Sequence, residues 1–329
     1  MLKSVIVTGG YGFIGSNLVR HLIEQGIDVL NLDDMRTGAD AGNLQDIEDA
    51  HNYRFKKVNL ADPIALKAAV GNFVPDVIFH LAAESHVDRS IEGPRPFMES
   101  NIIGTFNLLE LVRLESINCR FILVSTDEVF GSLELGSAEK FTENSRYKPS
   151  SPYSASKAAA DHLAKAWFET YDLDVIVTNC SNNYGPRQHS EKLVPMVIKN
   201  AISGKSIPVY GDGLNVRDWL FVDDHVSALI EIARNGVSGN SYLIGGNNEL
   251  PNIELIKLIF EILKREPRYL NHEFESLLKY VEDRAGHDRR YAIDSSKLMT
   301  ELNWEPSSCV EEGIRQTILW YLKLWGETR

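Results

Sequence analysis

The chain has 329 residues, 43% of them hydrophobic and 24% charged, which is typical of a globular protein with a buried core. Its formal net charge of −12 argues against a general nucleic-acid binder, which needs a basic face. No apolar run reaches about 18 residues, so no membrane span is predicted. The N-terminus lacks a signal-peptide pattern and the three cysteines have no disulfide-framework or metal-site spacing, so we expect a cytoplasmic protein without a bound metal.

The first half of the chain alternates β-rich runs with helical patterns. Strands are predicted at residues 4–8, 28–32, 76–81 and 120–125, and helices at 16–25, 99–115 and 153–171. This alternation indicates an α/β fold of the Rossmann type, a doubly wound parallel sheet with helices on both faces. The nearly continuous apolar character of the strands fits a sheet that is covered on both sides.

From about Asn182 the chain becomes richer in turns and its elements become shorter. Helical patterns return at 192–203, 223–235, 252–265 and 310–325. We therefore predict a cofactor-binding Rossmann domain at residues 1–180, to which some later segments return. Residues 181–329 are predicted to form mainly a smaller α/β substrate-binding domain.

A glycine-rich turn follows the first predicted strand and opens the first predicted helix. Its G-x-x-G-x-x-G spacing permits a tight turn and close approach to a pyrophosphate at the positive end of the helix dipole. A carboxylate ends the next strand, where it can bind ribose hydroxyls and repel a 2′-phosphate, although capping a turn is its alternative role. These features predict NAD rather than NADP, with contacts from Gly9, Gly12, Phe13, Ile14, Gly15 and Asp33.

Two further positions belong to the predicted cofactor site. Asp62 follows a third short strand and is suited to the adenine amino group, although a helix N-cap is a competing role. Ala82 and Ala83 follow the strand at 76–81, where their small side chains leave room for a cofactor. His80 is interpreted as a packed histidine.

Tyr153 and Lys157 stand four residues apart and therefore share one face of a predicted helix. A phenol is a weak base at neutral pH, but a neighbouring ammonium stabilises the phenolate and lowers its pKa. Such a pair can take the proton of an alcohol while hydride leaves for nicotinamide. An exposed helix pair without a function is the alternative for this spacing alone.

Thr126, Asp127 and Glu128 stand at the carboxyl end of a predicted strand, where open α/β sheets place their sites. Thr126 can hydrogen-bond a reacting hydroxyl. Two neighbouring carboxyl groups repel, so the pKa of one rises and that group can stay protonated. One acid and one base are what removal of water requires. A helix N-terminal acidic pair is the alternative.

These motifs together resemble the extended short-chain dehydrogenases/reductases, and within them the dTDP-glucose 4,6-dehydratase family. The resemblance rests on segments that span essentially the whole chain: 8–15, 82–90, 125–131, 153–157, 182–186, 191–193, 217–219 and 283–291. The segment Thr126-Asp127-Glu128 distinguishes this family from related epimerases and decarboxylases, which usually lack the acidic pair.

The resemblance implies an enzyme, a lyase that removes water from a nucleotide-sugar. Tyr153 would deprotonate the 4-hydroxyl as hydride leaves C4, Glu128 would take the C5 proton and Asp127 would protonate the leaving 6-hydroxyl. Hydride return to C6 gives a 4-keto-6-deoxy sugar, so NAD is expected to stay tightly bound and to be recycled. A UDP-sugar dehydratase, a 4-epimerase and a non-catalytic NAD- or nucleotide-sugar-binding protein are the alternatives.

The resemblance also implies a set of substrate contacts. They are Ser85, Thr126, Asn182, Glu191, Lys192, Leu193, Arg217, Asn252, Arg284 and His287. The two arginines suit a diphosphate, because a guanidinium matches phosphate geometry. The alternatives are an ion pair with Asp218 or Asp212 for Arg217 and an N-cap for Asn252. Residues 86–89 are expected either to reach the sugar or the diphosphate, or to form a structural network.

Two segments depart from the pattern of the family. Residues 35–43 are longer than the usual segment after the second strand and lack its tyrosine, and Ala285 stands where proline is commoner. The family also implies a homodimer, in which the helices at 99–115 and 153–171 form a four-helix bundle across a twofold axis. Phe106, Leu109 and Trp167 are predicted contacts, with the core of their own subunit as the alternative.

Overall fold

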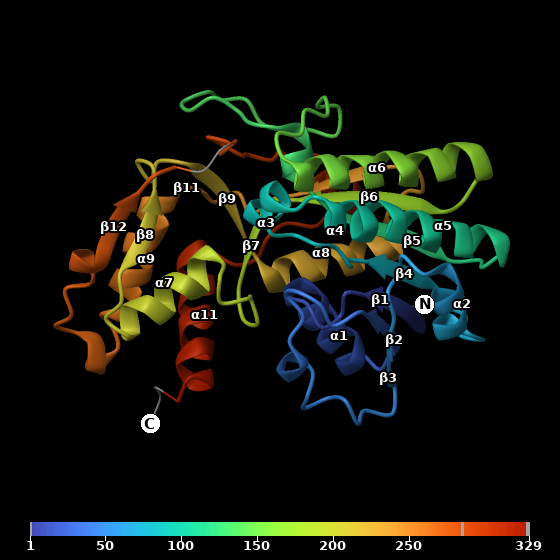
Figure 1. Ribbon diagram of the computed structural model, residues 1–329, viewed down its shortest axis with the longest axis horizontal. Helices are drawn as coiled ribbons and strands as arrows, with labels where there is room; N and C mark the ends of the chain where they lie inside the picture. The colour runs from blue at the N-terminus through green and yellow to red at the C-terminus, as the bar shows by residue number, and fades with distance from the viewer. Residues whose placement is uncertain (1, 284–285, 327–329) are drawn as a thin grey trace.

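A central parallel sheet organises this computed structural model, which describes residues 2–283 and 286–326 (Figure 1). Its seven strands lie in the order β10-β6-β5-β4-β1-β2-β3. Their bounds are β1 (Ser4–Thr8), β2 (Asp28–Asp33), β3 (Tyr53–Lys57), β4 (Val77–His80), β5 (Arg120–Thr126), β6 (Val175–Cys180) and β10 (Ser241–Ile244). The strand order reverses between β1 and β4, and such a switch point is where open α/β sheets hold their ligands.

Helices cover both faces of this sheet, as the sequence predicted (Figure 1). Val5 and Val7 of β1 pack in one core with α1 (Phe13–Glu24) and α8 (Val222–Asn235). Ile6 points the other way, into a core with α2 (Pro63–Val70), α5 (Gly104–Leu114) and α6 (Pro152–Tyr171). Because neighbouring residues of a strand face opposite sides, one apolar run serves both cores. The predicted Rossmann-type fold is confirmed.

Smaller sheets and a further set of helices make up most of the chain after residue 181. One sheet contains β7 (Asn182–Tyr184), β9 (Val216–Phe221) and β11 (Glu249–Pro251), and another pairs β8 (Ile207–Tyr210) with β12 (Leu278–Val281). A third core joins them to α7 (Leu193–Ile202), α9 (Asn252–Leu263) and α11 (Val310–Leu324). Two later elements return to the central sheet. β10 pairs with β6, and α10 (Ser296–Leu302) packs against β10.

The predicted helix at 99–115 has a more complex form in the structure. A separate helix, α3 (Val87–Glu92), precedes it; the continuous helix starts as α4 (Arg95–Phe97), passes through a π-helix over Met98–Ile103 and becomes α5 at Gly104. The wider turn carries Asn101, whose side chain accepts from the Glu84 backbone N–H at 2.8 Å and donates to Ser156 Oγ at 2.8 Å. Short 3₁₀ turns lie at Ala41–Asn43, Asp127–Phe130, Pro267–Tyr269 and Phe274–Leu277. A π turn in a helix is frequently found at a functional site.

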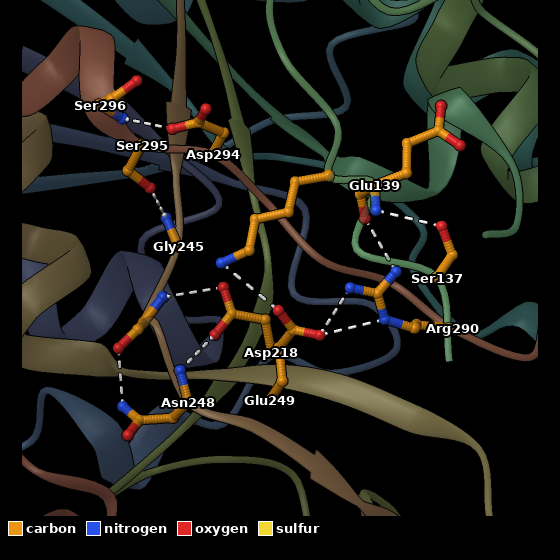
Figure 2. Close-up of polar contacts among 12 residues, drawn as sticks. Ser137, Glu139, Asp218, Gly245, Asn248, Glu249, Arg290, Asp294, Ser295 and Ser296 are labelled. Carbon is orange, nitrogen blue, oxygen red and sulfur yellow. Dashed lines mark hydrogen bonds and ion pairs between the residues drawn. The ribbon is translucent and has the colours of Figure 1, made fainter. Parts of the chain in front are cut away.

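A buried polar network ties the later segments to the central sheet (Figure 2). Asp218 of β9 accepts the backbone N–H groups of Gly246 and Asn248 at 3.1 and 2.8 Å. Glu249 receives the guanidinium of Arg290, with both nitrogen–oxygen distances at or below 3.0 Å. Since Arg290 is almost fully buried, this pairing satisfies a charge that would otherwise be costly. The network fixes β9, whose Arg217 is a predicted substrate contact.

Candidate active site

One cavity of about 350 Å³ opens at the carboxyl ends of β1, β2, β4, β5 and β6. It brings together most of the residues that the sequence singled out. Those that line it are Gly9, Gly12, Phe13, Ile14, Gly15, Asp33, Ala82, Ala83, Ser85, Thr126, Asp127, Glu128, Tyr153, Lys157, Asn182, Glu191 and Lys192. The described residues contain no group of His, Cys, Asp and Glu arranged to hold a metal ion. Within the same residues, no helix combines the length and apolar character needed to cross a bilayer.

The glycine turn forms one end of the cavity and is packed too tightly for side chains. Gly9 has a φ of +73°, and a Cβ there would lie 2.8 Å from the Ala82 backbone. A Cβ on Gly15 would lie 2.1 Å from the Gly9 carbonyl oxygen. No side chain caps the N-terminus of α1 and its first turn holds no acidic residue, so this helix end presents a positive dipole to the cavity. A bound diphosphate fits such a place.

Asp33 ends β2 and lines the same part of the cavity. Its Oδ2 accepts the Tyr11 backbone N–H at 2.9 Å and its Oδ1 accepts that of Met35 at 2.8 Å. Burial raises the pKa of this carboxyl, and the two N–H groups act in the opposite direction. The carboxylate is thus held in one orientation by the backbone, which suits a fixed contact with ribose hydroxyls.

Thr126, Asp127 and Glu128 lie where β5 ends and a 3₁₀ turn begins. Thr126 Oγ1 accepts the Glu128 backbone N–H at 3.3 Å and donates to Asp127 Oδ1 at 3.3 Å. Asp127 is only 1% exposed, and its Oδ2 has no hydrogen-bond partner among the described residues. Burial and the charge of Glu128 raise the pKa of Asp127 well above its usual range. Asp127 therefore favours the protonated state.

Tyr153 and Lys157 occupy the first turns of α6, which begins with a capping box at Ser151. Lys157 Nζ donates to the Val124 carbonyl oxygen at 2.8 Å. Burial and the charge of Glu128 raise the pKa of Tyr153 well above its usual value, while a hydrogen bond with the Thr126 side chain lowers it. The predicted lowering of this pKa is not observed, because burial and the nearby negative charges raise it.

Asp161 lies one helical turn beyond Lys157 and is fully buried. Its Oδ2 accepts hydrogen bonds from Asn179 Nδ2 at 3.0 Å and from the Tyr147 hydroxyl at 3.1 Å. Burial lowers the pKa of Lys157, whereas the charge of Asp161 raises it. Asp161 therefore acts as the buried counter-charge of Lys157. Asp161 was not predicted from the sequence, although its four-residue spacing from Lys157 on one helix was an available signal.

Two segments meet across the far part of the cavity. Arg89 Nη2 contacts both carboxylate oxygens of Glu191 at 2.8 and 3.0 Å, and His86 lies 3.7 Å from the same group. Lys192 Nζ donates to the Ser85 carbonyl oxygen at 3.4 Å. Residues 85–89 thus contact residues 191–192, which agrees with the structural network considered for residues 86–89.

Asp62 and Leu193 are predicted site residues that lie outside the described cavity lining. Asp62 Oδ1 accepts the backbone N–H groups of Ile64 and Ala65, both at 3.0 Å, and so caps α2. Leu193 begins α7 and packs against the third core. The N-cap that the sequence left as an alternative thus accounts for Asp62 without a ligand.

Arg217 is buried and is not among the residues that line the cavity. Its guanidinium stacks 4.4 Å from the centre of the Tyr291 ring, and its Nη2 donates to the Asp288 carbonyl oxygen at 2.9 Å. The two acidic groups considered as its partners are held elsewhere: Asp212 by Arg289, and Asp218 by backbone N–H groups. Its positive charge acts on Asp127, whose pKa it lowers.

The remaining predicted substrate contacts lie near the start of α9 and after β12. Asn252 is the first residue of α9, Pro251 is its N-cap, and no side chain caps this end. The N-cap role considered for Asn252 is therefore wrong, and its Oδ1 is buried with no partner among the described residues. His287 Nδ1 lies 2.5 Å from Asp283 Oδ1. Arg284 lies outside the described residues.

The structure also brings residues to the cavity that the sequence analysis did not select. Among them are Arg36, Asn59, Cys180, Ser181, Asn183 and Gln188. Several follow the ends of β2, β3 and β6, so the rule that sites gather at carboxyl ends of strands was the available signal. Burial raises the pKa of the Cys180 thiol to about 12, which fits an inert side chain.

Comparison with known proteins identifies the family of the chain. Residues 6–317 match the family model described as GDP-mannose 4,6 dehydratase. The dTDP-glucose 4,6-dehydratase of Neisseria gonorrhoeae is 48% identical over 333 residues, which cover 97% of this chain and 96% of that protein. The Escherichia coli enzyme of the same name is 48% identical, with 98% and 95% covered. The chain belongs to the dTDP-glucose 4,6-dehydratase family.

Solved structures of dTDP-glucose 4,6-dehydratases have the same fold as this chain. The Bacillus anthracis enzyme, solved in complex with NAD, superimposes with a TM-score of 0.87 at 43% identity and covers 98% of this chain and 97% of its own. The Streptomyces venezuelae enzyme, also with NAD bound, gives 0.91 at 39% identity, with 98% of both chains covered. UDP-glucose 4-epimerase of Thermotoga maritima gives 0.88 at 29% identity, with 98% and 99% covered.

Proposed function

We propose that the protein is an NAD-dependent lyase that converts dTDP-glucose to dTDP-4-keto-6-deoxyglucose and water. One observation carries this proposal: Thr126, Asp127 and Glu128 line the same cavity as Tyr153 and Lys157. A redox pair and an acid–base pair in one site are what an oxidation followed by an elimination requires. Relatives of nearly equal length, almost half identical to the chain, carry the name of this activity.

The cofactor end of the cavity suits NAD. The uncapped N-terminus of α1 would hold the diphosphate, Asp33 would hold the adenine ribose, and Ala82 and Ala83 would leave room between them. Related enzymes are solved with NAD bound. When bound, NAD⁺ supplies a positively charged acceptor that takes a hydride and gives it back, so it is not consumed.

Tyr153 acts as the base toward the sugar 4-hydroxyl in this proposal. The phenolate takes the hydroxyl proton as hydride leaves C4, and the Thr126 side chain lowers the pKa of the phenol. Lys157, whose ammonium is fixed against the Val124 carbonyl and opposite Asp161, contributes a positive charge at the base of the site. The product of this step is a 4-keto sugar, whose C5 proton is acidic.

Asp127 and Glu128 divide the elimination between them. Glu128 takes the C5 proton, because it is the less buried of the two carboxyl groups and its neighbour holds the proton. Asp127, whose pKa is raised by burial and by the charge of Glu128, gives its proton to the leaving 6-hydroxyl. Water leaves, a hydride returns to C6, and Glu128 gives a proton back to C5.

The nucleotide end of the substrate is assigned to the later segments of the chain. Asn182, Glu191 and Lys192 line the cavity and would contact the sugar. Leu193, Arg217, Asn252, Arg284 and His287 would extend the site toward the diphosphate and the base. We propose that β10 and α8 join residues 1–180 around the cofactor and that most of the remaining chain holds the nucleotide.

A homodimer through α5 and α6 is proposed as in the family. Phe106 is 38% exposed on α5 and meets Trp167 of α6 edge to face at 5.8 Å between ring centres. Ile103, Leu114 and Tyr171 add exposed apolar area. Leu109 is fully buried in the core of its own subunit, so it is not a contact across the proposed dimer. A cytoplasmic location stays a prediction from the sequence.

The second candidate function is a 4-epimerase or dehydratase acting on a UDP-sugar, which the fold of the Thermotoga maritima epimerase favours. Purified protein given dTDP-glucose and UDP-glucose in parallel, with products read by mass spectrometry, separates the two. We expect loss of one water from dTDP-glucose at a rate well above that from UDP-glucose. A 4-epimer without loss of water would contradict the proposal.

A further inference from the structure

Residues 182–192 must be held in a fixed position for the proposed function, on which this inference rests. They run from β7 to the N-cap of α7, and six of them line the cavity: Asn182, Asn183, Gln188, His189, Glu191 and Lys192. The cofactor would lie against a different element, the N-terminal turn of α1. Hydride transfer requires sugar and cofactor to be aligned closely, because a misplacement of about 1 Å can slow a reaction about a hundredfold.

Asn17 of α1 contacts this segment through both ends of its side-chain amide. Its Nδ2 donates to the Pro186 carbonyl oxygen at 3.1 Å, and its Oδ1 accepts from Arg187 Nη1 at 3.0 Å. The same Nδ2 donates at 3.0 Å to the carbonyl oxygen of Phe13, which begins α1 and lines the cavity. Asn17 is 6% exposed, so these hydrogen bonds are shielded from water. One side chain thus ties the segment to the turn that would hold the diphosphate.

Arg187 joins the same segment to a second helix. Its guanidinium lies 5.6 Å from the centre of the Trp320 ring, which belongs to α11. The next residue, Gln188, is held by the same helix, because its carbonyl oxygen accepts a hydrogen bond from the Tyr321 hydroxyl. The Arg187 side chain therefore connects α1, on the cofactor side, with α11, which packs in the third core.

The backbone of Arg187 has a conformation that is uncommon for a residue with a Cβ. Its φ is +71°, in the left-handed region. Such a conformation persists where surrounding contacts stabilise it, and it is frequent at functional sites. The guanidinium contacts with Asn17 and Trp320 provide that stabilisation. Asn17 and Arg187 both lie outside the described cavity lining, so they act on the site through the segment.

We propose that Asn17 and Arg187 are positioning residues, which hold residues 182–192 against α1 and so fix the substrate sugar relative to the cofactor. Neither residue takes a proton or touches a reactant. Loss of this link should loosen the segment and slow hydride transfer at each site, without reducing the number of sites that hold NAD. Because the two side chains act through a shared hydrogen bond, removing both should cost little more than removing one.

Hydrogen exchange of backbone amides reports this link without any reaction. Residues 187–192 would be compared in wild type, Arg187→Gly and Asn17→Ala. Glycine adopts the left-handed conformation without strain, so Arg187→Gly removes the guanidinium and adds no backbone cost. We expect exchange in this segment to be about tenfold faster in both variants, because local opening exposes its amides, and exchange in β1 and β5 to stay unchanged. Unchanged exchange in residues 187–192 would overturn the proposal.

Single-turnover kinetics test the effect on the reaction. Rapid-quench assays with dTDP-glucose, unlabelled or deuterated at C4, would compare wild type, Arg187→Gly, Asn17→Ala and the double variant, with sites counted from bound NAD. We expect the rate per site to fall about tenfold or more in each single variant, with a deuterium isotope effect at least as large as in wild type. The double variant should be no slower than the slower single one. Arg187→Lys, which keeps a donor for Asn17, should restore part of the rate.

Arg54→Ala is the control for loss of a stacked arginine. Arg54 is exposed on β3, and its guanidinium lies 5.5 Å from the centre of the Phe73 ring. Its removal should leave both the rate per site and the exchange of residues 187–192 at wild-type values.

Three kinetic outcomes would overturn the proposal. Fewer sites with NAD, each reacting at the wild-type rate, would leave Asn17 and Arg187 with a role in stability alone. A slower rate per site with no isotope effect would mean that a step other than hydride transfer is impaired. Independent losses that multiply in the double variant would show that the two residues do not act together. Failure of the wild type to release water from dTDP-glucose would instead overturn the proposed function.

Discussion

Tyr153 is the base in the first chemical step of the proposed mechanism, and its surroundings disfavour the phenolate that this step requires. Burial and negative charge raise the pKa of the phenol. Tyr153→Phe removes the base but keeps the ring, which packs edge to face on Phe97. We expect turnover to fall by roughly 10²- to 10⁴-fold with the fold intact. The control is Tyr171→Phe, which changes an exposed ring of the same helix. Wild-type turnover by Tyr153→Phe would show that the phenolate is not the base.

Asp127 should leave a signature in the pH dependence of stability. Its raised pKa means that the folded protein binds more protons than the unfolded chain from about pH 4, the unfolded value, up to the raised pKa. The free energy of unfolding therefore falls as pH rises through this window. Asp127→Asn lacks this loss, so its gain in stability over wild type should be larger at pH 8 than at pH 5.

Urea unfolding at the two pH values measures this difference. Asp294→Asn serves as the control, because hydrogen bonds from Ser296 lower the pKa of Asp294 and place its titration below about pH 4. The control should differ from wild type by the same amount at both pH values. A difference for Asp127→Asn that does not change with pH would show that Asp127 is not held protonated by its surroundings.

Individual site residues differ in how well the sequence predicts them. Thr126, Asp127 and Glu128 follow directly after a strand, so local pattern placed them at the cavity. Asp62 also follows a strand, yet it caps α2, and the sequence offered no way to separate the two roles. The sign of the Tyr153 pKa shift could not be predicted, because burial is a property of the folded chain.

The turn that opens α1 is the element on which cofactor binding depends. A Cβ on Gly15 would overlap the Gly9 carbonyl oxygen, so Gly15→Ala must displace the turn. We expect a loss of about 1–3 kcal/mol in the free energy of unfolding and a lower NAD content in the purified protein. Gly93→Ala is the matched control, because its nearest neighbour atom would lie 4.0 Å from the new Cβ. Equal NAD content in the two variants would contradict the assigned role of the turn.

Local signals predicted some elements almost to the residue. The sequence placed a helix at 153–171, and α6 spans Pro152–Tyr171 because Ser151 caps one end and Asp172, in a left-handed conformation, ends the other. Residues 175–180 were not assigned, although β6 is fully buried there. Its pairing with β5 and β10 decides its structure, and that pairing joins distant parts of the chain. The π turn at Met98–Ile103 likewise depends on contacts of Asn101 with Glu84 and Ser156.

In the whole molecule, the exposed apolar face of α5 and α6 is the surface through which we propose that two copies associate. Phe106→Glu places a charge on that face and should convert a protein of twice the chain mass into one of single mass in light scattering. Leu135→Glu, an equally exposed position in a loop outside these helices, should leave the mass unchanged. A wild-type monomer at micromolar concentration would contradict the dimer.

The central claim is that one site oxidises, dehydrates and reduces the same sugar without releasing hydride to solution. The most direct measurement gives purified protein dTDP-glucose deuterated at C4, with no NAD added, and locates the label by mass spectrometry and NMR. We expect loss of one water with the deuterium at C6 of the product, because the hydride is retained on a tightly held cofactor. Product without deuterium at C6, or no product even after NAD is added, would contradict it.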